Sequence, residues 1–103
     1  MCRIFAGQDP ANYACITRSV RLAGHATSIR LEAAFWEIID EIAAAQGMTT
    51  PRFLSTLYDE VLELQGQVPN FASLLRTATI QYLRSTDRVM AEAQRELAAT
   101  AAE

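Results

Sequence analysis

Two side chains that can recognise a ligand through hydrogen bonds, Ser28 and Arg30, stand on the same side of a predicted strand. Residues 27–32 alternate, with an apolar side of Thr27, Ile29 and Leu31 and a polar side of Ser28, Arg30 and Glu32. A guanidinium offers paired N–H donors to a planar acceptor, and a serine hydroxyl can donate or accept. We therefore expect this face to recognise a polar partner, held in place by the elements around it.

A single strand cannot satisfy its own backbone N–H and C=O groups, so residues 27–31 need a partner strand. Everything after them has helical spacing, and the simplest partner is the same strand of a second molecule. Residues 18–22 also alternate, however, and Gly24 allows a turn before the main strand at 26–31. An intermolecular two-stranded ribbon and a local hairpin both remain open.

Three helices are predicted after the strand. The first covers residues 33–46 and ends at Gly47, and its acidic residues Glu37, Asp40 and Glu41 are interpreted as a solvated face. The second begins with Thr50 as N-cap and Pro51 as the first helical residue, and runs to about residue 64.

Asn70 is predicted to cap a third helix, which continues with a thinner apolar stripe through residues 85–100. At the other end of the chain, residues 1–16 are predicted to form an arm. This arm has a possible short strand at 3–5 and a turn of helix near 10–14. No internal repeat is evident.

Charge is distributed unevenly along the 103 residues, whose net charge is −3. Residues 1–31 hold four arginines and one aspartate, a net +3, whereas residues 32–103 hold five arginines and eleven acids, a net −6. A focused anion-binding face would produce this asymmetry, and so would a solvated surface without function. No apolar run could cross a bilayer and no signal-peptide pattern opens the chain, so we expect a cytoplasmic protein.

Cysteine and histidine are sparse. Cys2 and Cys15 are expected to be reduced thiols, and a zinc or thiol sensor built from them and His25 would match no closed zinc pattern. The sequence shows no catalytic constellation. It has one histidine, no glycine-rich phosphate loop and no pair of carboxylates whose setting suggests perturbed pKa values. We expect no enzyme, no metal and no cofactor.

The order of strand, helix of about four turns, glycine-containing turn and capped helix is that of a ribbon-helix-helix unit. The segments TSIRLE, FW, EIAA and NFASLLR, with the opening MCRIFAGQDPANY, resemble a bacterial ribbon-helix-helix domain family of small proteins. The resemblance covers residue 1 to about residue 84. It implies a mainly α fold with a short β ribbon, arranged as an intertwined homodimer with an intermolecular ribbon. The implied division is an arm at 1–25, a core at 26–64 and an additional C-terminal helix at 65–103.

Members of that family resemble DNA-binding repressors, and the resemblance assigns roles to residues of this chain. Outward side chains at Ala26, Ser28 and Arg30 would meet base edges in the major groove, although Ala26 stands where a third polar reader is expected. The start of the second helix would hold a phosphate through Thr49, Thr50 and Arg52. The dimer interface would contain Ile29, Leu31, Trp36, Ile39, Leu57 and Val61.

Two functions follow as expectations. The first is a sequence-specific transcriptional regulator bound to a palindromic operator. The second is an antitoxin-like or scaffold protein that offers its C-terminal helix to another protein, because residues 85–103 carry a single thin apolar stripe. The two functions can coexist in one protein.

Overall fold

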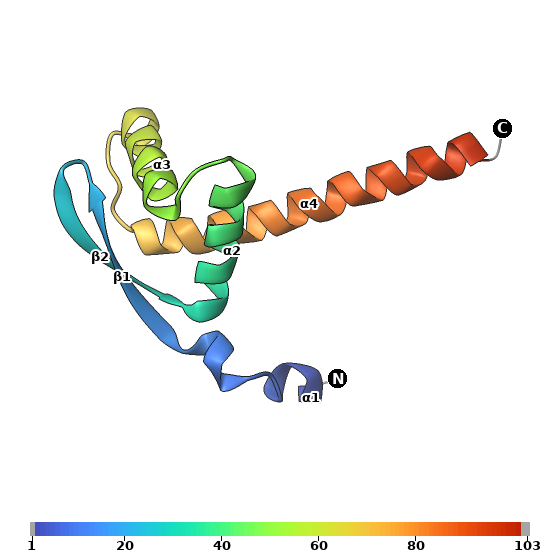
Figure 1. Cartoon of the computed structure of the whole chain (residues 1–103), viewed down its shortest axis with the longest axis horizontal. Coiled ribbons are helices and arrows are strands. Elements are labelled where there is room, and N and C mark those ends of the chain that lie inside the picture. Colours follow the sequence, from blue (N-terminus) through green and yellow to red (C-terminus); the bar gives the residue numbers. More distant parts are fainter. Residues whose placement is uncertain (1, 102–103) are drawn as a thin grey trace.

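The chain folds as a two-stranded ribbon followed by three helices (Figure 1). The computed structural model describes residues 2–101, and for residues 87–94 and 96–101 it describes the backbone alone. The helical elements are α1 (Cys2–Ala6), the 3₁₀ turn η1 (Pro10–Tyr13), α2 (Ala33–Ala45), α3 (Thr50–Gln65) and α4 (Phe71–Ala101). The strands are β1 (Cys15–Leu22) and β2 (His25–Glu32). This is the mainly α fold with a short ribbon that the sequence predicts.

The ribbon is a hairpin within one chain. β1 and β2 pair antiparallel along their whole length, from Cys15 opposite Glu32 to Leu22 opposite His25. Ala23 and Gly24 form the two-residue turn with φ of 50° and 81°. Positive φ at both positions is what a type I′ hairpin turn requires, because that turn matches the twist of the strands.

Within the chain, residues 27–31 therefore have β1 as their partner, and the pairing with a second molecule stays a prediction. The local hairpin was the alternative left open, and the structure has it. Its signal in the sequence was weak because Ala23 occupies a left-handed position that asparagine or glycine usually fills.

One face of the hairpin packs against the helices and closes a core inside the single chain. Trp36 and Leu31 are almost completely buried, and the indole Nε1 of Trp36 donates a hydrogen bond to the carbonyl of Ile16 at 2.8 Å. The buried apolar residues are Val20, Leu22, Ile29, Leu31, Trp36, Ile39, Ile42, Ala43, Phe53, Leu54 and Leu75.

This core contains four of the six residues that were expected at the dimer interface. Ile29, Leu31, Trp36 and Ile39 are buried by their own chain and are not open to a second one. The single chain closes this core by itself, with Val20 and Leu22 of β1 among its members. Leu57 and Val61, the other two expected interface residues, are half-buried on α3.

The first turns of α4 belong to this core. Leu75 and Thr79 are 0 % and 1 % exposed, and α4 packs against both α2 and β2. The side chain of Asn70 accepts a hydrogen bond from the backbone N–H of Ser73 at 3.1 Å, which confirms the predicted cap. Beyond the core, α4 extends away from the other elements (Figure 1).

The N-terminal arm differs from the prediction in one element. Residues 3–5 lie in α1 and not in a strand, and the N–H of Gly7 bonds the carbonyl of Arg3 at 2.9 Å. The arm thus satisfies part of its backbone locally instead of adding a strand to the ribbon. The helical turn near 10–14 is confirmed as η1, where the Asp9 side chain accepts from the N–H of Ala11.

Candidate nucleic-acid interface

Six exposed residues form the face of the ribbon that points away from the helices, which we call the outer face. Opposed residues of an antiparallel pair lie on the same face, so the register assigns the members directly. The opposed pairs are Thr17 with Arg30, Ser19 with Ser28, and Arg21 with Ala26.

The sequence prediction named the three members from β2, namely Ala26, Ser28 and Arg30, and missed the three from β1. The alternation of residues 17–22 is the signal that could have found Thr17, Ser19 and Arg21. It becomes a prediction about the outer face only when the hairpin register is known.

Arginines of the ribbon divide between its two faces. Arg21 and Arg30 are exposed on the outer face, which carries no acidic residue among its six members. Arg18 lies on the opposite face, with its guanidinium 4.4 Å from the centre of the Trp36 ring and bonded to Asp40. The basic character of residues 1–31 therefore reaches the outer face through Arg21 and Arg30.

Asp40 connects three elements. Its carboxylate accepts hydrogen bonds from Nη1 and Nη2 of Arg18 at 2.7 and 3.0 Å, and from Oγ1 of Thr50 at 2.7 Å. The bonds from Arg18, followed by the one from Thr50, hold the pKa of Asp40 below its ordinary value. Asp40 is thus more than part of a solvated face: its side chain is partly exposed, and it also joins α2 to β1 and to the start of α3.

The start of α3 is arranged differently from the prediction. Thr49, and not Thr50, is the N-cap, and its side chain accepts from the N–H of Arg52 at 3.4 Å. Thr50 is drawn into the helix because its hydroxyl donates to Asp40, ten residues earlier. The carbonyl of Thr49 also accepts from the N–H of Phe53 at 2.9 Å.

These contacts bear on the predicted phosphate site. The N–H groups of Arg52 and Phe53 already have acceptors within the chain, and the Asp40 carboxylate lies at this helix end. An anion at a helix N-terminus is stabilised by the helix dipole. At the start of α3 that anion is the carboxylate of Asp40. The exposed side chain of Arg52 is the remaining group at this end that suits a phosphate.

A second ion pair fixes the end of β2. Nη2 of Arg76 on α4 lies 2.7 Å from Oε1 of Glu32, and the Arg76 guanidinium lies 5.8 Å from the Phe35 ring. This bond lowers the pKa of Glu32 from its ordinary value. Glu32 is therefore neutralised by α4 and adds no unpaired negative charge beside the outer face.

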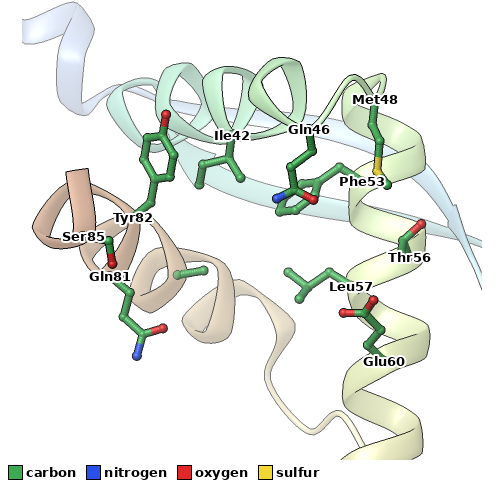
Figure 2. Close-up of a pocket in the computed structure, with 11 residues that line it drawn as sticks. Ile42, Gln46, Met48, Phe53, Thr56, Leu57, Glu60, Gln81, Tyr82 and Ser85 are labelled. Atoms are coloured by element: carbon green, nitrogen blue, oxygen red, sulfur yellow. The ribbon is translucent and has the colours of Figure 1, made fainter. Parts of the chain in front are cut away.

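An open groove of about 390 Å³ lies between the end of α2, α3 and α4 (Figure 2). In Figure 2, Leu57 and Phe53 extend from α3 toward the space that faces α4. Ile42 and Tyr82 add apolar surface from α2 and α4, while Gln46, Glu60 and Gln81 add polar groups. The groove is separate from the outer face.

The cysteines and the histidine do not form a site together. Cys15 and His25 lie at opposite ends of the ribbon, seven residues apart in the register, which corresponds to about 23 Å. Both cysteines are exposed and unpaired. Among the side chains that the structure describes, those of residues 2–86 and 95, no three metal-binding groups gather. None of the described helices is long and apolar enough to cross a membrane.

Comparison with known proteins agrees with this geometry. The chain matches the model of the ribbon-helix-helix domain over residues 15–83, from the start of β1 into α4. It is also similar to a solved structure, that of an uncharacterized protein from Bordetella pertussis Tohama I. The sequence identity is 40 %, the TM-score is 0.82, and the match covers 85 % of this chain and 70 % of that one. Comparison with curated proteins gives no match.

The family match extends beyond the strand and two helices of the minimal unit. It includes β1, which completes the ribbon, and the turns of α4 that carry Leu75 and Thr79. Ribbon-helix-helix domains are in general regulatory DNA-binding modules that act as dimers, and they are not a family of enzymes. This chain belongs to the ribbon-helix-helix domain family.

Proposed function

We propose that this protein is a sequence-specific DNA-binding transcriptional regulator that inserts its ribbon into the major groove. The observation that carries the proposal is the exposed outer face of the hairpin, on the side away from the core. Its six members include no acidic residue, and Glu32, which follows on the same side of β2, is paired with Arg76. A two-stranded ribbon fits the major groove, which is about 12 Å wide. Arg30 can bond O6 and N7 of a guanine, and Ser28 can donate or accept at a neighbouring base.

Phosphate contacts would come from a second element, the start of α3. Arg52 at the start of α3, beside Thr49 and Thr50, is suited to hold a backbone phosphate and so to fix the register of the ribbon. The net charge of −3 leaves little general affinity for DNA away from this surface. We place the activity in the bacterial cytoplasm, where chromosomal DNA is accessible.

The test is capture of fragmented genomic DNA by the purified protein at a fixed salt concentration of about 150 mM, since phosphate binding depends steeply on salt. We expect a recurring site that Arg30→Ala loses. Arg84→Ala, which removes an exposed arginine of α4, is the matched control and should keep the site. A folded protein that enriches no sequence would contradict the proposal, and so would a site that Arg30→Ala leaves unchanged.

We propose further that two chains form a homodimer, as the family generally does, and bind a palindromic operator. Two half-sites read by a symmetric dimer lie about 34–36 Å apart, one turn of DNA. The half-buried Leu57 and Val61 and the exposed Ile80 and Leu83 provide apolar surface along α3 and α4 for the contact.

Sedimentation equilibrium tests the dimer. We expect twice the monomer mass for the protein, the monomer mass for the double variant Ile80→Glu with Leu83→Glu, and a dimer for the control Thr77→Glu on the same helix. A monomer at all concentrations would contradict the dimer and leave the DNA-binding proposal standing.

A second function, interaction with another protein, is favoured by the part of α4 that extends past the core (Figure 1). A single helix without neighbours offers a face to a partner, as in helix-in-groove recognition. Deletion of residues 86–103 should leave the fold and DNA binding intact and remove the partner recovered from cells. Recovery of the same partner by the shortened chain would contradict this role.

A further inference from the structure

We infer that β1 supplies half of the base-reading surface, with Arg21 as a second guanine-reading residue that mirrors Arg30. The inference rests on the proposed function, because it concerns the same outer face. It goes further by assigning a role to a strand outside the minimal strand-helix-helix unit.

The two strands carry the same short motif. Ser19-Val20-Arg21-Leu22 in β1 corresponds to Ser28-Ile29-Arg30-Leu31 in β2, at a constant offset of nine residues. Such a short match has no weight in the sequence alone, and for that reason no repeat is evident there. It gains meaning from the register, because Ser19 lies opposite Ser28.

That pairing gives the hairpin an approximate two-fold axis, perpendicular to the ribbon and passing between the two serines. A rotation about this axis carries Arg21 onto the position of Arg30, and carries the buried Val20 and Leu22 onto the buried Ile29 and Leu31. The chain thus builds, from two different strands, the symmetric ribbon that the sequence prediction expected from two molecules.

The distances suit DNA. Arg30 lies opposite Thr17, so Arg21 and Arg30 are four residues apart along the ribbon, which is about 13 Å. Base pairs rise about 3.4 Å each, so the two guanidiniums meet bases about four steps apart. Since the two-fold axes of ribbon and duplex can coincide in the groove, the two guanines belong to opposite DNA strands.

The inward arginine of β1 marks the limit of the symmetry. Arg18 corresponds to Thr27 under the rotation, and its guanidinium is occupied by Asp40. The symmetry therefore holds for the serine and arginine pairs of the outer face and for the buried apolar pairs. It is broken at Arg18, where α2 is contacted, and at the outer pair of Thr17 with Ala26. Arg21, by contrast, is exposed, and its one polar contact among the described residues is with the carbonyl of Gly24 at 3.3 Å.

The test is selection of binding sites from randomised duplex DNA by the full chain at fixed salt. We expect a short inverted element with one guanine on each strand. Arg21→Ala should remove the preference at one guanine and Arg30→Ala at the other, each weakening binding to the selected duplex by about ten- to a hundredfold. Arg84→Ala is the control, and circular dichroism checks that every variant is folded.

A second variant gives a positive readout. Glutamine pairs with adenine in the major groove, so Arg21→Gln should change one arm of the element from guanine to adenine and leave the other arm unchanged. An element altered by Arg30→Ala but by neither Arg21 variant would overturn the role of β1 and preserve the proposed function. If the unaltered protein selects no sequence, the proposed function fails, and this inference fails with it.

Discussion

Asp40 of α2 and Arg18 of β1 are joined by two hydrogen bonds, at 2.7 and 3.0 Å, over the face of Trp36. This pair attaches the strand that completes the ribbon to the helix that follows it. Since both side chains are about 40 % exposed, the pair is screened by water and contributes more to geometry than to stability.

Replacing Asp40 with asparagine keeps the shape of the side chain and removes its charge. We expect Asp40→Asn to lower the free energy of unfolding by about 1 kcal/mol, a small cost because the pair is partly exposed. Urea denaturation measures it. Glu41→Gln, on the exposed side of the same helix, is the control and should change stability by less than about 0.5 kcal/mol. Equal effects of the two substitutions would contradict a special role for Asp40.

Acid should weaken the fold through the same carboxylate. Hydrogen bonds from Arg18 lower the pKa of Asp40 in the folded chain, and the bond from Arg76 lowers that of Glu32. A group with a lowered pKa in the folded state contributes stability that is present above its unfolded pKa and is lost as pH falls through the folded value. The urea midpoint should therefore be steady near neutral pH and fall below about pH 4. In Asp40→Asn the urea midpoint should fall less steeply below that pH. The same fall in the variant and in the unaltered protein would contradict the role given to the Asp40 carboxylate.

The hairpin turn contains a correctable strain. Ala23 has φ of 50°, a left-handed conformation that costs an ordinary residue about 1 kcal/mol and that asparagine tolerates better. Ala23→Asn should raise the free energy of unfolding by about 0.5–1 kcal/mol and create the Asn-Gly turn that hairpins prefer. Ala23→Val, with a branched side chain at the same position, should lower it. Thermal denaturation of the unaltered protein and of both variants measures these changes in stability. A loss of stability in Ala23→Asn would refute the turn assignment.

Leu75 tests whether α4 belongs to the core. The side chain is completely buried, so Leu75→Ala should destabilise the chain by about 2–5 kcal/mol. Thr77→Ala, two residues later on the exposed side of α4, should cost less than about 1 kcal/mol. Similar small losses for both would mean that α4 is an appendage and that the core closes without it.

The elements that local spacing determines were predictable from the sequence. The alternation of residues 27–31, the apolar spacing of α2 and α3, and the Asn70 cap are all present in the structure. What could not be predicted depends on contacts between distant residues. Thr50 loses the capping position to Thr49 because Asp40 accepts its hydroxyl, and no pattern near residue 50 reveals that competitor.

The candidate site was half predictable for a similar reason. Ser28 and Arg30 stand out because their own strand alternates clearly. Arg21 and Arg18 are both arginines and lie only three residues apart, yet Arg21 is exposed on the outer face and Arg18 is bonded to Asp40 on the opposite face. Which of them faces outward depends on the register with β2. That register is set by the turn at Ala23 and Gly24, and alanine at a left-handed position does not predict a hairpin turn.

A ribbon built within one chain also changes how the surface can vary. When two identical molecules each contribute one strand, every substitution appears twice and the surface must remain symmetric. Here β1 and β2 are encoded separately, so Arg21 and Arg30 can be exchanged one at a time. Such a hairpin can evolve, or be engineered, toward an asymmetric target without the need for a second gene.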